Sequence, residues 1–311
     1  MRGDVPGRGR FVFSSTGDLT RAVATESAAR ERLPASWLRG IAESLFATIF
    51  PSECRLCNAF LTNISRLPVC DECISALKPL EGKLCDICGE RLSHAQSMSG
   101  SDEDICAMCR NEAPPYVAAS AYGSYDTQLR DLIHLLKYDK VLPAAAVLGE
   151  KLAQAIKRMQ DQMTEQTLFE GPPLLLVPVP LHSSKSRERG FNQAELIARA
   201  ALKHAVGQRL ELSTHLLRRR RVTESQIGLT QNQRKQNLRG AFAVTEPDKL
   251  QGCEVLLVDD VFTTGTTASE CARVLRRAGA TKVWVATVAR TLKKSVQTAE
   301  LVQGVPVAMT G

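Results

Sequence analysis

The chain has 311 residues and a mass of 34.0 kDa, enough for one large domain or two ordinary ones. It is 44% hydrophobic and 23% charged, which excludes a fibrous, collagen-like or wholly disordered chain. Its apolar runs are far shorter than the roughly 20 residues of a membrane-spanning helix, and none follows the first arginines as a secretory signal would require. These features predict a soluble, cytoplasmic protein with no segment inserted in a membrane.

Positive charge is concentrated in one part of the chain. The net charge is +7, a mild excess that permits anionic partners without requiring them. Residues 181–241 alone carry 13 Lys and Arg against 4 Asp and Glu, a surplus larger than that of the whole chain.

The composition divides the chain into four parts. Residues 1–35 have no helical or strand period and predict a flexible tail. Residues 36–112 begin with apolar residues at helical spacing, which predict a short packing helix, and continue as a cysteine-rich module. We expect a second domain at 113–295 and a C-terminal tail at 296–311.

Eight of the ten cysteines lie between Cys54 and Cys109, all in C-x-x-C pairs. A chain without an export signal keeps its thiols reduced, so this spacing indicates metal binding and not disulfides. Four thiolates form a closed tetrahedral shell, which is typical of structural zinc, whereas an iron–sulfur cluster is a less favoured alternative. One or two Zn²⁺ are expected, on the quartets Cys54, Cys57, Cys70 and Cys73, and Cys85, Cys88, Cys106 and Cys109.

The pairing of these quartets stays open between sequential and cross-braced arrangements. Asn58 and Gly89 each follow the first pair of a quartet and tolerate positive φ, which favours the sequential arrangement. His94 lies inside the second quartet and is predicted to be a solvated loop residue, with replacement of a cysteine ligand as the alternative. The remaining cysteines, Cys253 and Cys271, are predicted to be core residues.

Elements of both kinds follow the cysteines. A strand is predicted at 116–122, a helix through 129–136 and a long helix at 143–164 that begins with proline. A Leu/Val-rich strand at 174–179 is of the kind that is buried on both faces of a parallel sheet, and a helix at 193–204 comes next.

The last third alternates regularly after a polar loop that extends to Arg239. We predict a strand at 254–258, a helix at 266–278 and a strand at 282–288. A strand, a helix and a strand at this spacing form a right-handed crossover unit, which predicts an α/β fold with a doubly wound, mostly parallel sheet.

The segment 255–267 carries the chemistry. A four-residue apolar strand ends in Asp259 and Asp260, and a hydroxyl-rich turn then opens a helix. Backbone N–H groups at a helix N-terminus and threonine hydroxyls bind phosphate oxygens. The two carboxylates can accept hydrogen bonds from ribose hydroxyls or hold Mg²⁺. The pattern predicts a site for a phosphorylated sugar. The alternative is an ordinary strand–turn–helix junction with a threonine N-cap.

This segment resembles the signature of the type I phosphoribosyltransferase family: four apolar and two acidic residues, then Thr-Thr-Gly-x-Thr. The pieces at 177–181, 187–193, 219–226 and 234–242 resemble the ComF (GntX-like) branch, which joins a cysteine-rich zinc module to a phosphoribosyltransferase-like domain. Lys137-Tyr138 is similar to the Lys-Tyr element of that branch, although Asp139-Lys140 stands where it has a glycine.

The resemblance implies a role for each matching residue. Asp259 and Asp260 would bind the ribose hydroxyls at the reacting sugar. Pyrophosphate would lie at the loop after the strand at 174–179, with Arg187 and Arg189 as the nearest cations. The phosphate-binding set is Thr263, Thr264, Gly265, Thr266 and Thr267, and the pyrophosphate and basic set is Leu181, His182, Ser183, Ser184, Arg187, Arg189, Arg219 and Arg221.

Two functions remain open from the sequence. One is a phosphoribosyltransferase that uses phosphoribosyl pyrophosphate and Mg²⁺ with an unknown acceptor, in which residues 219–226 form a mobile lid. The other, implied by the association of the ComF branch with competence, is a DNA-handling protein in which Arg218–Arg221 contact single-stranded DNA and the zinc module binds a DNA-uptake partner protein. The alternative to both functions is that Arg218–Arg221 form a solvated surface run with no binding role.

Overall fold

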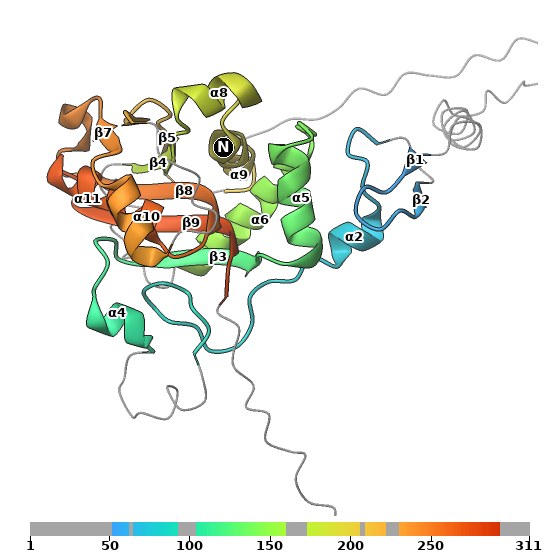
Figure 1. Cartoon of the computed structure of the whole chain (residues 1–311), viewed down its shortest axis with the longest axis horizontal. Coiled ribbons are helices and arrows are strands. Elements are labelled where there is room, and N and C mark those ends of the chain that lie inside the picture. The colour runs from blue at the N-terminus through green and yellow to red at the C-terminus, as the bar shows by residue number, and fades with distance from the viewer. Residues whose placement is uncertain are drawn as a thin grey trace, which may run out of the picture.

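The computed structural model describes residues 52–61, 65–92, 104–159, 173–205, 209–221 and 230–292. The tails predicted at 1–35 and 296–311, the helix predicted before Pro51, and His94 lie outside these ranges. In Figure 1 a central sheet lies between helices, and two small cysteine-rich units lie beside it.

The central sheet has five parallel strands in the order β3-β9-β8-β4-β5. This order confirms the predicted doubly wound α/β fold. The strands are β3 (Ala119–Ser124), β4 (Leu174–Pro178), β5 (Leu210–Leu212), β8 (Glu254–Phe262) and β9 (Lys282–Arg290).

Helices cover both faces of this sheet. α5 (Thr127–Lys137), α6 (Ala144–Met159) and α9 (Gln193–Leu202) pack on one face, and α11 (Thr266–Arg277) packs on the other. Each presents an apolar stripe to the sheet; in α11 this stripe is Ala268, Cys271 and Leu275, all buried.

Shorter elements complete the fold. On the α11 side, β6 (Leu217–Arg219) pairs antiparallel with β7 (Phe242–Val244). The other elements near the sheet are α8 (Ser183–Arg189), α10 (Gln231–Leu238) and the 3-10 helix η2 (Pro247–Leu250). The cysteine-rich units contain β1 (Ser52–Glu53), β2 (Phe60–Leu61), α2 (Asp71–Ser75) and α4 (Ala107–Asn111).

Side-chain alternation along β8 divides the core in two. Leu256 and Val258 pack with α5, α6 and α9, whereas Val255 and Leu257 pack on the α11 side. The first cysteine quartet contributes Cys54 and Cys73 to the former core, and all four cysteines of the second quartet belong to the latter. The two cysteine-rich units are therefore anchored to opposite faces of one sheet.

The strand order also locates a crevice. From β4 the chain moves outward to β5, and from β8 it moves outward in the opposite direction to β9. The order therefore reverses between β4 and β8, and ligands of open α/β sheets bind at the carboxyl ends of the strands at such a point. The segments after β4 and β8 are the ones that carry the predicted phosphate-binding residues.

Several predicted bounds are wrong. The strand predicted at 254–258 continues to Phe262, because β9 supplies ladder partners as far as Arg290. The strand predicted at 116–122 is shifted to Ala119–Ser124. The polar loop predicted before Arg239 contains α10, whose first turn is closed by a capping box between Thr230 and Gln233.

Among the described residues, no helix combines the length and the apolar character needed to cross a bilayer. Cys271 is buried as predicted, whereas Cys253 is only half-buried, because it precedes β8 at the edge of the core.

Candidate functional site

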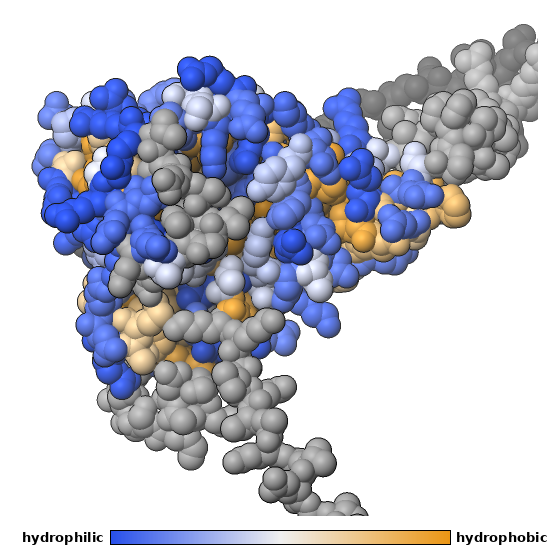
Figure 2. Space-filling view, in the orientation of Figure 1, coloured by the Kyte–Doolittle hydropathy of each residue, from blue (hydrophilic) through white to orange (hydrophobic). Residues whose placement is uncertain are grey.

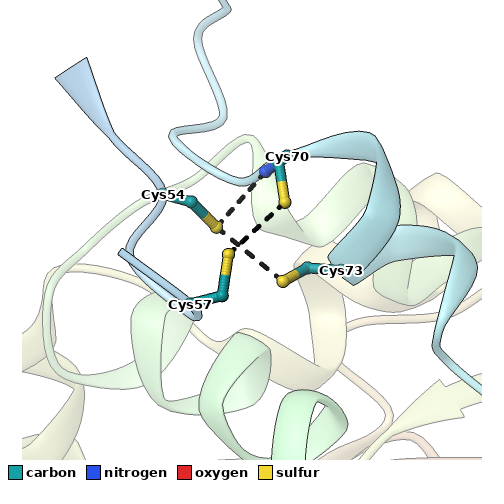
Figure 3. Close-up of side chains that lie close together, drawn as sticks. All are labelled: Cys54, Cys57, Cys70 and Cys73. Carbon is teal, nitrogen blue, oxygen red and sulfur yellow. Dashed lines mark hydrogen bonds between the residues drawn. The ribbon is translucent and has the colours of Figure 1, made fainter. Parts of the chain in front are cut away.

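The cysteines form two tetrads, each with four sulfur atoms gathered within 4.8 Å of one another. Figure 3 shows the first tetrad, in which Cys54 and Cys73 are 3.9 Å apart and Cys57 and Cys70 are 3.6 Å apart. In the second tetrad the sulfurs of Cys88 and Cys106 are 3.6 Å apart. Zinc–sulfur bonds of about 2.3 Å in a tetrahedron place sulfurs about 3.8 Å apart, so both tetrads fit Zn²⁺.

The tetrads confirm the sequential pairing. Each is built from two neighbouring C-x-x-C pairs and not from alternating ones. Asn58 has a φ of 62° and Gly89 a φ of 69°, as expected for the residue after each first pair. The turn at Gly89 is also close to the sheet, because a Cβ there would lie 3.0 Å from the Ala119 carbonyl oxygen.

We expect two zinc ions per chain, which a chelator removes in two phases. The first tetrad contains the exposed Cys57, whereas all four cysteines of the second are buried, so the first zinc leaves faster. Colorimetric zinc release would show both phases. Cys57→Ser would abolish the fast phase, and Cys253→Ser, which lies outside both tetrads, would leave both intact. A single phase from the unmodified chain would contradict this expectation.

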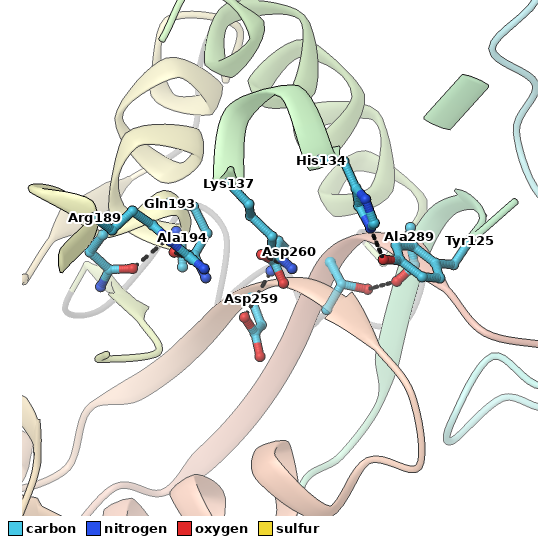
Figure 4. A network of polar contacts seen from close by, with 11 residues as sticks. Tyr125, His134, Lys137, Arg189, Gln193, Ala194, Asp259, Asp260 and Ala289 are labelled. Atoms are coloured by element: carbon cyan, nitrogen blue, oxygen red, sulfur yellow. Dashed lines mark hydrogen bonds and ion pairs between the residues drawn. The ribbon is translucent and has the colours of Figure 1, made fainter. Parts of the chain in front are cut away.

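The two aspartates of β8 serve different sides of the sheet. Asp259 lines a pocket on the α11 side, and it accepts a hydrogen bond of 2.9 Å from the backbone N–H of Asp260. Asp260 is buried and faces α5, as Figure 4 shows. Because both residues lie inside the strand, its alternation separates their side chains.

Lys137 at the end of α5 binds Asp260. Its Nζ lies 2.6 Å from Asp260 Oδ2, and the two side chains are 14% and 6% exposed. Burial by itself would lower the pKa of Lys137, but attraction to Asp260 outweighs it and raises the pKa. Lys137 therefore stays charged and neutralises Asp260.

The pKa of Asp259 is raised to about 7. The main cause is burial, which disfavours the carboxylate, and the neighbouring charge of Asp260 adds to it. Asp259 therefore changes its charge near neutral pH.

Asp259 and the turn that follows β8 line the same pocket. It has a volume of about 290 Å³ with the solvent at its mouth included, and its polar lining comes from Asp259, Thr263, Thr267 and Thr287. Thr264 and Thr266 are joined by a hydroxyl hydrogen bond of 2.8 Å. The turn leads into the N-terminus of α11, whose first N–H groups have no partner inside the helix. An anion in the pocket would therefore meet hydrogen-bond donors.

Gly265 permits the tight path of this turn. It has a φ of 73° directly before α11, and a Cβ there would lie 2.6 Å from the ring of Phe262 and 3.3 Å from the hydroxyl of Tyr116. Only glycine combines this backbone conformation with so close a packing.

The segment after β4 is mostly helical, although a loop was expected there. His182 caps α8 by accepting a hydrogen bond of 3.2 Å from the Ser184 N–H. Ser183, Ser184 and Arg187 are exposed, and Leu181 is half-buried. Arg189 donates a 2.6 Å hydrogen bond to Gln193, and its guanidinium lies 5.6 Å from the ring centroid of Tyr138. Figure 4 shows Arg189 and Gln193 beside Lys137 and Asp260.

The basic residues predicted near the site differ in their environment. Arg219 is half-buried in β6 with its guanidinium 5.5 Å from the centroid of Phe242, and burial lowers its pKa despite attraction to Asp259. Arg221 is exposed and donates to the carbonyls of Asn237 and Arg239. The lid predicted at 219–226 lies outside the described residues from position 222 onward.

Three residues at the site received no role from the sequence. Lys137 was noted only as part of a Lys-Tyr element. Arg234, which donates a 3.3 Å hydrogen bond to Thr263 Oγ1, was noted only as part of the family-like piece at 234–242. Thr287 pairs with Asp259 in the β8–β9 register, and the available signal was a lone polar residue in the apolar interior of that strand.

Comparison with known proteins agrees with this architecture. Residues 45–110 match the family model of the double zinc ribbon domain, and residues 192–304 match that of the phosphoribosyl transferase domain. Competence protein F of Haemophilus influenzae is 27% identical over 242 residues, 78% of this chain and 98% of that protein. DNA utilization protein YhgH of Salmonella typhimurium is 34% identical over 242 residues, which again cover 78% of this chain and 98% of that protein. The chain belongs to the ComF family.

More distant similarities are to a further competence protein and to a solved enzyme. Competence protein ComFC of Bacillus subtilis is 24% identical over 221 residues, which cover 68% of this chain and 79% of that protein. A solved hypoxanthine phosphoribosyltransferase of Staphylococcus aureus is 14% identical over 46% of this chain and 64% of its own, with a TM-score of 0.29. The matches to the family models show that this chain combines a double zinc ribbon with a phosphoribosyl transferase domain.

Proposed function

We propose that the chain binds phosphoribosyl pyrophosphate, or a closely related phosphorylated ribose, at the carboxyl end of β8. The observation that carries this proposal is the common pocket of Asp259 and the threonine turn. A carboxylate accepts from sugar hydroxyls, and the donors of the turn and of the α11 N-terminus suit a phosphate. One pocket therefore offers complementary groups for both ends of a ribose phosphate.

Asp259 and the threonine oxygens beside it also suit Mg²⁺, which prefers oxygen ligands and binds few protein groups directly. Mg²⁺ bound there would neutralise charge on a departing pyrophosphate. In this proposal Asp260 acts through its ion pair with Lys137, which holds the Asp260 side chain against α5. Transfer of the phosphoribosyl group to an acceptor is the activity that this arrangement would serve, with the acceptor unassigned.

The affinity for phosphoribosyl pyrophosphate should increase as the pH rises from 6 to 8. Since the pKa of Asp259 is about 7, the ionised fraction rises about tenfold from pH 6 to pH 8, and the affinity for phosphoribosyl pyrophosphate with Mg²⁺ should rise by a similar factor. Isothermal titration calorimetry would measure it. In Asp259→Asn the affinity should be lower, with only the weaker pH dependence of the ligand's own phosphates. No binding by the unmodified chain at pH 8 would overturn the proposed function.

Binding of single-stranded DNA is the second candidate. Relatives named DNA utilization protein and competence protein point to it, and Arg218, Arg220, Lys235 and Arg239 are exposed on neighbouring elements. Figure 2 shows mainly hydrophilic residues over α10, α11 and β7. Such a surface would follow a phosphate backbone. In the same proposal, the zinc ribbons bind a DNA-uptake partner protein. The protein is cytoplasmic in this proposal, which agrees with its reduced thiolates.

The salt dependence of DNA affinity tests this candidate. For each single-strand phosphate contact, the slope of log affinity against log salt changes by about 0.7. Arg218→Ala/Arg220→Ala should therefore flatten the slope by about 1.4. Arg276→Ala/Arg277→Ala removes the same charge from the far end of α11 and should leave the slope unchanged. Equal slopes for both double variants would exclude β6 as the DNA contact.

A further inference from the structure

The second tetrad is tied to the end of the sheet by a buried arginine. Arg290, the last residue of β9, is 4% exposed. It donates to the carbonyl oxygen and, over 3.7 Å, to the sulfur of Cys88, and its Nη2 lies 2.9 Å from Glu90 Oε2. A buried guanidinium beside a tetrad of thiolates offsets part of their negative charge. Arg290 therefore links the second tetrad to the end of β9.

The same guanidinium lies against the residue that supports the phosphate-binding turn. Its carbon is 4.6 Å from the ring centroid of Phe262, and this ring is the atom group closest to a Cβ built at Gly265. Tyr116 meets Phe262 edge-on at 6.3 Å between centroids. Phe262 also accepts a backbone hydrogen bond of 2.9 Å from Thr291. A continuous chain of contacts thus runs from Cys88 through Arg290 and Phe262 to Gly265.

We propose that Arg290 is a positioning residue that couples metal at the second tetrad to the order of the turn at 263–267. When the tetrad holds its metal, Arg290 is fixed between Cys88 and Phe262, and the ring of Phe262 fixes the turn. When the metal leaves, the segment that carries Cys88 and Glu90 is no longer held by the tetrad, so the partners that fix Arg290 become mobile and the turn loosens. For the ligand affinity of the turn, the inference rests on the proposed function; for its order it does not.

The first tetrad provides an internal comparison. Cys54 and Cys73 belong to the core on the α5 side, with Leu77, whose carbonyl accepts a 2.7 Å hydrogen bond from Tyr122. That core lies on the opposite face of the sheet from the pocket. Removal of the first zinc should therefore leave the turn unchanged.

Hydrogen exchange of the amides at 263–267 tests the coupling without any ligand. The full chain is compared with two, one and no zinc ions bound, and alkylation with mass spectrometry identifies the tetrad that has lost its metal. We expect the same exchange rate after loss of the first zinc and at least a tenfold faster rate after loss of the second. An unchanged rate after loss of the second zinc would overturn the inference.

Substitutions separate the effect of Arg290 on the turn from the effect of the metal. Arg290→Lys keeps the charge but cannot contact Cys88, Glu90 and Phe262 together, so the turn should exchange about tenfold faster with both zinc ions bound. The matched control is Arg158→Lys: Arg158 also donates to backbone carbonyls, of Ala121 and Tyr122, and lies 5.9 Å from an aromatic centroid. Equal exchange in both variants would refute the role of Arg290.

The ligand provides the reciprocal readout. Since coupling between two sites is mutual, saturating phosphoribosyl pyrophosphate with Mg²⁺ should slow zinc release from the second tetrad, and Arg290→Lys should abolish this effect. If the unmodified chain binds no phosphoribosyl pyrophosphate, the proposed function fails and the exchange experiment alone decides the coupling. If it binds and neither exchange nor zinc release changes, the coupling fails and the proposed function stands.

Discussion

Gly265→Ala should lower the affinity for phosphoribosyl pyrophosphate by at least about a hundredfold, because one methyl group would displace the turn from the pocket. The methyl carbon would lie 2.6 Å from Phe262, and that ring cannot retreat, since Arg290 and Tyr116 pack against it. The backbone must move instead, and with it the donors at 263–267. Strain and clash together should cost about 3 kcal/mol of folding free energy.

Gly252→Ala is the matched control for this substitution. Gly252 has the same φ of 73°, but nothing lies within 4 Å of a Cβ built there. It should cost only the left-handed conformation, about 1 kcal/mol, and leave the affinity unchanged. Calorimetric titration and urea unfolding measure the two effects. Similar affinity losses in both variants would show that the turn does not hold the ligand.

Lys137→Met should destabilise the fold by about 3 kcal/mol, because Asp260 would be left as a buried charge without a partner. The pair is closed at 2.6 Å with little exposure of either side chain. In Lys137→Met/Asp260→Leu the uncompensated charge is gone, and most of the lost stability should return. Urea unfolding at pH 8 measures all three proteins.

The exposed pair of Lys83 and Asp104 is the control for burial. Its atoms are 3.5 Å apart and its side chains are 59% and 36% exposed, so Lys83→Met should change the stability by less than about 0.5 kcal/mol. If Lys137→Met is as mild as Lys83→Met, or if Asp260→Leu brings no recovery, the ion pair does not hold Asp260.

Local patterns in the sequence predicted most of the elements and both tetrads. Each C-x-x-C pair brings two ligands together within four residues, and Asn58 and Gly89 mark the turn after the first pair of each tetrad. The threonine turn and its glycine follow from the same kind of short-range signal. The elements, the C-x-x-C pairs and the threonine turn are encoded locally, since each depends on neighbours close along the chain.

The errors arose where a partner far along the chain decides the outcome. A strand predicted to end at Val258 reaches Phe262, because β9 continues beside it. Asp259 and Asp260 consequently face opposite sides, although adjacent carboxylates suggested one shared site. The segment after β4 forms α8, with a histidine in the capping position that serine or aspartate usually takes.

By itself the sequence determined the parallel α/β fold, the eight metal ligands and the segment that carries the candidate site, because periodicity and spacing act over short distances. The ion pairs and contacts between distant charged residues became visible only in the folded chain. Lys137 and Asp260 are 123 residues apart, and Cys88 and Arg290 are 202 apart. No local pattern encodes such pairs, since the order of strands in the sheet brings them together.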